Sequence, residues 1–228
     1  MKHLIVVLLM FLLVNSTFSQ EAISIGNSLP DFTLESFKGE KVTPVDLHGK
    51  KVLYMFVRGK VGDHWCQICH YQYAELSALE EKEHIRDKYN LEIIFVLPYS
   101  ADEVRKWVEA FPHQMDVIEG WKNPDNYENL SPGRKNWTNT ARKYFKNSYK
   151  YEEDRIATPF PILIDADRQL SKSLGIFTTL WDNSYVEQNQ PTIFIVDETG
   201  IVKFKYFSQS ALDRPDADYL LNYIEKMM

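Results

Sequence analysis

The two cysteines of the chain lie close together, in the sequence Trp65-Cys66-Gln67-Ile68-Cys69. Two thiols at this spacing can close into a disulfide and reopen, and the attacking group in such chemistry is the thiolate. An unperturbed cysteine has a pKa of about 8.5, so only ~3% of it is ionised at pH 7. The spacing predicts a redox-active pair, provided that the fold lowers the pKa of one thiol.

The elements on either side of the pair provide that condition. The apolar run at 52–57 predicts a buried strand, and the segment from Gln67 onward predicts a helix with Ile68 and Leu76 on its inner side. The cysteines therefore lie at a strand-to-helix junction, where free N–H groups and the positive end of the helix dipole stabilise a thiolate. A structural disulfide is the weaker interpretation, because so small a loop constrains the unfolded chain little.

Further strands and helices alternate along the chain. Ser100 opens a helix through a capping box, and Pro44 predicts that the short strand around Val42 lies at a sheet edge. Buried strands are predicted at 52–57, 91–97, 160–165 and 191–197, followed by a hairpin strand at 201–206 and a closing helix at about 215–226. This order predicts an α/β fold with a central mixed sheet flanked by helices and an N-terminal strand extension.

The segment at about 112–158 interrupts this alternation and is predicted to be an insertion. Its first half is turn-rich, and its second half has aromatic residues at helical spacing. Residues 134–150 contain six basic residues and no acidic one: Arg134, Lys135, Arg142, Lys143, Lys146 and Lys150. This stretch could bind a partner or an anionic substrate. We favour the simpler interpretation of a solvated helix face, which is usual on soluble proteins.

The N-terminus predicts export. A basic start, an apolar run at 4–14 and small residues before Gln20 are typical of a secretory signal peptide, with cleavage after Ser19. We therefore expect a signal peptide at 1–19, one domain at 20–228, and a periplasmic or extracellular location without membrane attachment after cleavage. Loss of Lys2 would change the formal net charge from −6 to −7, which disfavours a general nucleic-acid binder.

Several motifs together resemble the thioredoxin fold, and more closely its peroxiredoxin-like branch, the alkyl hydroperoxide reductase/thiol-specific antioxidant (AhpC/TSA) family. The segment from Gly26 to Leu34 resembles the N-terminal motif of that family. Phe-Val-Arg-Gly at 56–59 before the Trp-Cys-x-x-Cys sequence is similar to the active site of one subgroup. The strands at 160–165 and 191–197 match later strands of the family, and the resemblance extends over about 25–227 outside the insertion.

The resemblance implies a thiol-dependent oxidoreductase with Cys66, Cys69, Pro191, Trp65 and Arg58 in its site. Pro191 would be a cis-proline beside the cysteine pair, whereas an edge-strand proline is the alternative. Trp65 would shield the pair or serve only in packing. Arg58 would replace an arginine that is missing beside the strand at 191–197, or form a surface ion pair.

Two reactions remain open. In thiol–disulfide exchange, Cys66 is the more exposed nucleophile and Cys69 resolves the mixed disulfide. In hydroperoxide reduction, one thiolate becomes a sulfenic acid and the other thiol condenses with it. Peroxiredoxins have Pro-x-x-x-Thr/Ser-x-x-Cys, and counted back from Cys69 this chain has Gly62 and Cys66 instead. We favour exchange with a protein disulfide or dithiol over reduction of a hydroperoxide, with an external thiol reductant.

Two other classes of site fit the same residues. Cys66 to His70 matches the haem attachment pattern Cys-x-x-Cys-His, but the site follows a strand and lacks a convincing axial methionine. A metal carrier could bind through both cysteines with His64 or His70, because thiolates are soft ligands. We expect neither a cofactor nor a metal.

Overall fold

The computed structural model describes residues 23–152 and 156–228, so the signal peptide predicted at 1–19 lies outside the described residues. Seven strands form the central sheet in the order β11-β10-β3-β6-β7-β1-β2. These strands are β1 (Leu34–Ser36), β2 (Lys41–Val42), β3 (Lys51–Phe56), β6 (Leu91–Leu97), β7 (Ile162–Ile164), β10 (Thr192–Val196) and β11 (Val202–Phe207). The three strands β3, β6 and β7 are parallel, and every other neighbouring pair is antiparallel. The predicted mixed sheet is confirmed, with β2 at an edge.

Both faces of this sheet are buried. Along β3, Leu53 and Met55 face one apolar cluster, and Val52, Tyr54 and Phe56 face the other. Successive side chains of a strand point to opposite faces, so a strand covered on both sides needs an uninterrupted apolar run. This is why the runs at 52–57 and 91–97 were readable as strands in the sequence.

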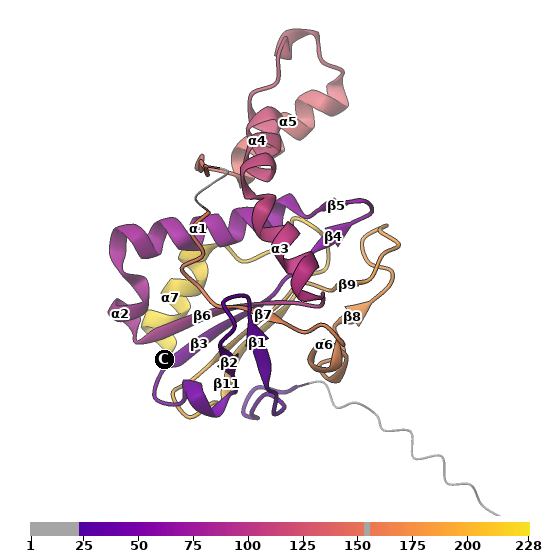
Figure 1. Ribbon diagram of the computed structural model, residues 1–228. Coiled ribbons are helices and arrows are strands. Elements are labelled where there is room, and N and C mark those ends of the chain that lie inside the picture. The colour runs from indigo at the N-terminus through magenta and orange to yellow at the C-terminus, as the bar shows by residue number, and fades with distance from the viewer. Residues whose placement is uncertain (1–22, 153–155) are drawn as a thin grey trace, which may run out of the picture.

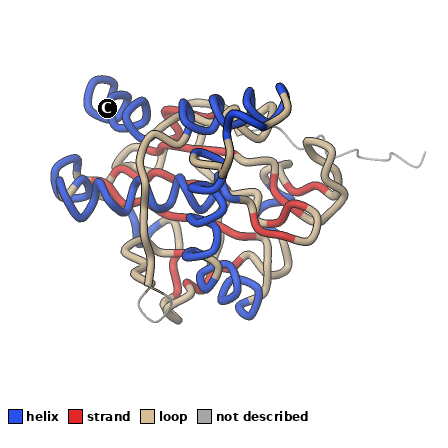
Figure 2. The backbone as a smooth tube through the Cα atoms, turned by 90° about the horizontal axis from the view of Figure 1, so that it is seen from above, coloured by secondary structure: helices blue, strands red, loops and turns tan. Residues whose placement is uncertain are grey.

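Helices cover both faces (Figures 1 and 2). They are α1 (Gln67–Glu83), α2 (Ile85–Tyr89), α3 (Ala101–Glu109), α4 (Phe111–Lys122), α5 (Pro132–Tyr144), α6 (Gln169–Ser173) and α7 (Ala217–Met227), with 3₁₀ turns η1 (Val45–Leu47) and η2 (Tyr127–Asn129). The larger cluster joins one sheet face to buried residues of α1, α3, α4 and α7. The smaller cluster joins the other face to α6. Within the described parts of the chain, no helix is both long and apolar enough to cross a bilayer.

The segment at 112–158 contains more helix than its composition indicated. Its first part, expected to be turn-rich, is mostly α4, which begins at Phe111 with Pro112 in its first turn, where a missing N–H removes no helical hydrogen bond. Met115 and Ile118 are buried and fix α4 to the larger cluster. Figure 1 shows α4 and α5 projecting beyond α1, so this segment adds a wall beside the helix that carries the cysteines.

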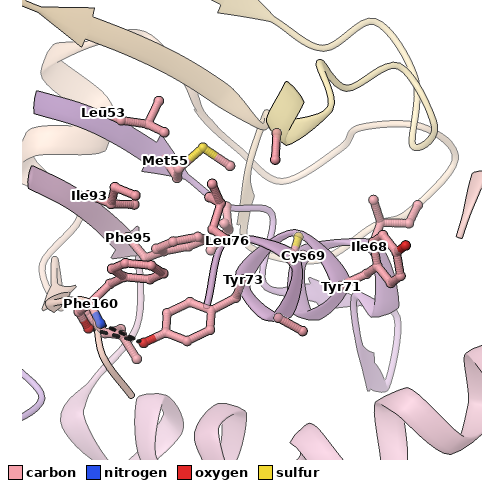
Figure 3. Close-up of a cluster of buried hydrophobic side chains, with 14 of the residues drawn as sticks. Leu53, Met55, Ile68, Cys69, Tyr71, Tyr73, Leu76, Ile93, Phe95 and Phe160 are labelled. Atoms are coloured by element: carbon pink, nitrogen blue, oxygen red, sulfur yellow. Dashed lines mark hydrogen bonds between the residues drawn. The ribbon is translucent and has the colours of Figure 1, made fainter. Parts of the chain in front are cut away.

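The hydroxyl of Tyr73 connects α1 to the loop before β7. It donates to the carbonyl of Phe160 at 3.2 Å and accepts from the N–H of Phe160 at 3.3 Å (Figure 3). We expect Tyr73→Phe to lower the free energy of unfolding by about 1–3 kcal/mol, because buried backbone groups lose their partner. Urea denaturation measures this change, with Tyr219→Phe at a 54% exposed position as the matched control. Equal stabilities of the two variants would contradict this role of the Tyr73 hydroxyl.

Candidate active site

The turn after β3 places the cysteine pair. Gly59 has φ +78°, and a Cβ there would lie 2.2 Å from the ring of Tyr99, so only glycine fits. The carbonyl of Gly59 accepts a 2.8 Å hydrogen bond from the N–H of Cys66. Cys66 is the N-cap of α1, and Cys69 follows in its first turn. The strand-to-helix junction predicted from the sequence is therefore present.

A short hairpin separates Gly59 from Cys66. Strands β4 (Lys60–Val61) and β5 (His64–Trp65) pair through a tight turn. The ring of Trp65 packs edge-on against Tyr99, with 5.6 Å between ring centroids, and the ammonium of Lys60 lies 5.2 Å from the Trp65 ring. Trp65 thus has a packing role, and shielding of a disulfide by Trp65 remains a prediction.

The two thiols are free and almost entirely buried. Cys66 is 2% exposed and Cys69 is 0% exposed. Cys66 is the more exposed of the two, as expected, but both thiols are buried within the larger apolar cluster. Figure 3 shows Cys69 on α1 within this cluster, near Ile68 and Leu76.

The environment shifts the pKa values of the two thiols in opposite directions. Burial raises the pKa of Cys69, but the hydrogen bond with Cys66, the charge of Arg214 and a hydrogen bond from Gly59 outweigh it, so the pKa of Cys69 falls well below its usual value. The pKa of Cys66 is raised by its hydrogen bond to Cys69 and by burial. These opposite directions favour the thiolate at Cys69 and the thiol at Cys66.

Arg214 is the functional residue that sequence reasoning missed. Its Nη1 lies 3.8 Å from the Sγ of Cys69 and donates to Oε1 of Gln72 at 3.1 Å. Arg214 comes from the segment between β11 and α7, far from the cysteines in the sequence. It places a cation beside the sulfur of Cys69, whereas the family resemblance pointed to Arg58 as the replacement for the missing arginine. The one signal in the sequence was a basic residue just before the N-terminus of the last helix.

Arg58 does not contact the thiols through any hydrogen bond or ion pair in the described residues. It is buried and donates to Oε1 of Gln188 at 2.7 Å and to the carbonyl of Trp181 at 3.0 Å. Its guanidinium carbon is 4.7 Å from the centre of the Trp181 ring, and that of Arg214 is 6.0 Å from the same centre. Arg58 does form an ion pair, with Asp182 at 3.8 Å, but its side chain is buried and not at the surface. These contacts fix the Trp181 loop beside Arg214.

The prediction of a cis peptide bond at Pro191 is wrong. No peptide bond in residues 23–152 and 156–228 is cis. The bond before Pro191 is therefore trans. Gln190 donates its N–H to the carbonyl of Ile176 at 2.8 Å, and the carbonyl of Pro191 accepts from the N–H of Ser208 at 2.9 Å. Thr192 pairs with Phe56, which places Pro191 at the end of β3 that leads to the cysteines. Contact of Pro191 with the pair stays a prediction.

The histidines do not extend the site toward haem or metal binding. His70 is fully buried, and its two ring nitrogens lie 3.1 Å from the carbonyl of Cys66 and 2.8 Å from that of Trp107. Neither nitrogen is available to iron or another metal. His64 lies on the exposed hairpin beside Asp63. The described residues contain no group of three or more His, Cys, Asp or Glu placed to hold a metal.

Comparisons with known proteins agree with this architecture. Residues 25–123 match the AhpC/TSA family. The thioredoxin-like protein YneN of Bacillus subtilis is 32% identical over 103 residues, which are 44% of this chain and 55% of that protein, so the chain spans about half the length of this curated relative.

Two solved structures share the fold. AhpC of Enterococcus faecalis superposes with a TM-score of 0.56 at 17% identity, covering 90% of this chain and 92% of that one. A peroxiredoxin 6 of Arenicola marina superposes with a TM-score of 0.54 at 14% identity, covering 90% and 73%. The predicted thioredoxin-like fold is confirmed.

Replacement of Arg214 by glutamine should raise the pKa of Cys69, since the cation that favours its thiolate is lost. We expect the thiolate absorbance near 240 nm to titrate about one to two pH units higher, the shift that corresponds to one charged hydrogen bond. Less thiolate would then be present at pH 7. Arg214→Lys, which keeps the charge, should restore part of the shift. An unchanged titration in Arg214→Gln would show that the arginine has no influence on the thiol.

Proposed function

We propose that this protein is a thiol-dependent oxidoreductase, because residues 25–123 match the AhpC/TSA family and the chain has the thioredoxin-like fold. Cys66 and Cys69 cycle between dithiol and disulfide, and thiol–disulfide exchange is the main reaction. The observation that carries this proposal is the pair of free cysteines at the N-terminus of α1, with the guanidinium of Arg214 3.8 Å from the Sγ of Cys69. A purely structural pair would need no neighbouring cation.

The exchange reaction uses the single proton of the pair. Transfer of this proton from Cys66 to Cys69 makes Cys66 the thiolate, and Cys66 has the only measurable exposure. Cys66 attacks one sulfur of a substrate disulfide, and the other substrate sulfur leaves as a thiolate. Cys69 then gives up its proton and attacks Cys66, which releases the second substrate thiol. The pair loses two electrons to the substrate, and the proton and negative charge of the pair pass to the two products.

Local opening at the pair is part of this proposal, because both sulfurs are buried. Cys66 is the N-cap of α1, and the hairpin of β4 and β5 comes directly before it in the chain. A shift of this hairpin exposes Cys66 without unfolding α1. We also propose that the protein is exported by the segment at 1–19 and is returned to its dithiol form by an external thiol reductant.

Single cysteine variants test the exchange reaction. We expect Cys69→Ser to accumulate a mixed disulfide through Cys66, because nothing resolves it, whereas Cys66→Ser should accumulate little. Mass spectrometry after incubation with an oxidised substrate peptide measures both. The reduction potential of the wild type should lie between about −120 and −270 mV, the range of exchange catalysts. A potential below about −300 mV, with no trapped adduct, would identify an inert structural disulfide.

Hydroperoxide reduction is the second candidate, and the position of the thiolate favours it. Cys69 occupies the position of the peroxidatic cysteine counted in the sequence, and both Arg214 and the N–H of Gly59 stabilise its negative charge. The Cys69 thiolate would attack the O–O bond and become a sulfenic acid, while the alkoxide leaves and takes up a proton. The Cys66 thiol would condense with the sulfenic acid, which forms the disulfide and releases water.

Peroxide consumption with the same two variants distinguishes the candidates. If Cys69 is peroxidatic, Cys66→Ser should still reduce one equivalent of hydroperoxide and form a sulfenic acid that dimedone labels. Cys69→Ser should lose at least about 90% of the initial consumption, because the attacking sulfur is absent. Retention of the wild-type rate in Cys69→Ser would remove the peroxidase candidate and leave disulfide exchange.

A further inference from the structure

A cleft lies beside Arg214. Its volume is about 410 Å³, and it lies between α1, α5 and the segment that leads into α7. Its walls include the aromatic residues Tyr71 and Tyr144, together with Gln72, Lys143, Arg214 and Pro215. Arg214 therefore contacts Cys69 and also lines the cleft. The hydroxyl of Tyr144 lies near enough to Arg214 and both cysteines for their charges to affect its pKa, which burial raises.

The acidic residues of the cleft have partners within the fold. Asp216 caps α7 by accepting from the N–H of Tyr219 at 2.9 Å, and it pairs with Lys146 at 3.7 Å. Glu75 accepts a hydrogen bond from the N–H of Ala217, and burial raises its pKa. In contrast, the described residues give Lys143 no ion pair. Lys143 thus presents an unpaired positive charge at the cleft, although the formal net charge of the whole chain is −6.

Arg214 has two unused donors on one edge of its guanidinium. Nη1 is occupied by Gln72 and Cys69, whereas Nε and Nη2 are buried and have no hydrogen-bond partner among the described residues. Nε–H and Nη2–H point in the same direction, which is the geometry that binds both oxygens of a carboxylate. A buried, unpaired donor is unfavourable, and a bound carboxylate would satisfy two of them.

We propose that this cleft binds the small-molecule redox partner of Cys66 and Cys69, and that this partner is an organic thiol or disulfide carrying a carboxylate. The carboxylate would pair with Arg214 and Lys143, and the apolar part would lie against Tyr71 and Tyr144. The size of the cleft suits a molecule of a few amino-acid units and excludes a folded protein domain. This inference rests on the proposed exchange function, and the reaction with the cysteine pair is the one described above.

The basic stretch at 134–150, interpreted above as a solvated face, thereby gains a function at two positions. Lys143 lies in the last turn of α5, and Lys146 lies just after the end of that helix. Both residues line the cleft. The predicted insertion therefore supplies the positive side of the pocket, opposite the helix that carries the thiols.

The test compares two disulfides that differ only in charge: 3,3′-dithiodipropionate and its diamide. Each oxidises the reduced wild-type protein, and alkylation of the remaining thiols with mass analysis gives the rate constants. The same two disulfides are also reacted with dithiothreitol, and the ratio of rate constants for the protein is divided by the ratio for dithiothreitol. This division removes the difference in intrinsic reactivity between the two disulfides. We expect a normalised preference of about tenfold for the dicarboxylate, the effect of one charged hydrogen bond.

The variants locate the preference. Lys143→Gln should lower the normalised preference for the dicarboxylate about two- to threefold, which is the usual effect of an exposed charge. Arg214→Gln should bring the ratio close to one, because the carboxylate partner is lost, and its effect on the thiols changes both rate constants alike and cancels in the ratio. Lys150→Gln, an exposed position outside the cleft, is the matched control and should change nothing.

Three results would overturn the proposal. A normalised wild-type ratio of one or less would show that the cleft does not select a carboxylate. Equal losses in Lys143→Gln and Lys150→Gln would show that any preference is a general charge effect. Failure of both disulfides to oxidise the protein would overturn the exchange function itself, whereas oxidation at equal rates would overturn only the cleft proposal. Because Lys143 is exposed, its variant keeps the test valid even if Arg214→Gln does not fold.

Discussion

The contact between Arg214 and Cys69 is the interaction on which the rest of the site depends. A buried cation is unfavourable unless a negative charge compensates it, and a buried thiolate is unfavourable unless donors and a cation surround it. Each group here satisfies part of the requirement of the other. The pKa of Cys69 is lowered and that of Cys66 is raised, so the negative charge is favoured on Cys69 and the proton on Cys66. Oxidation to a disulfide removes the negative charge, so the redox state of the pair also changes the electrostatic environment of Arg214.

The fold holds this contact by joining distant segments at one end of the sheet. The turn at Gly59 follows β3, and the close packing of Tyr99 on Gly59 fixes that turn against the chain that follows β6. The Trp181 loop is held by Arg58, and Asp182 in that loop accepts a hydrogen bond from the N–H of Ala211, just before Arg214. The path from Arg58 through the loop to Arg214 is continuous, so Arg58 acts as a positioning residue through its neighbours.

The sequence allowed the sheet and the cysteine pair to be predicted because both are local patterns. Apolar runs in β3 and β6, the capping box at Ser100 and the Cys-x-x-Cys spacing are each contained in a few consecutive residues. Arg214 was not predictable in this way, because 145 residues separate it from Cys69 and no local pattern distinguishes it from other basic residues. The burial of Cys66 was not predictable for a related reason, because it depends on packing within the larger cluster, whose members are distant in the sequence. The cis conformation of Pro191 was carried over from family resemblance, and the hydrogen bonds of Gln190 and Pro191 in this chain accompany a trans bond instead.

The cleft connects specificity to reactivity through a single side chain. If substrate binding and thiolate stabilisation used separate residues, a bound carboxylate would only raise the local concentration of substrate. Substrate binding and thiolate stabilisation both involve the guanidinium of Arg214 in this proposal. A carboxylate bound to its Nε–Nη2 edge would therefore partly neutralise the positive charge that stabilises the Cys69 thiolate. The thiolate of Cys69 then becomes less stable and holds a proton more readily, which favours transfer of the shared proton from Cys66 to Cys69. That transfer is the step that produces the attacking Cys66 thiolate, so occupation of the cleft and activation of the nucleophile are coupled by the same electrostatic interaction.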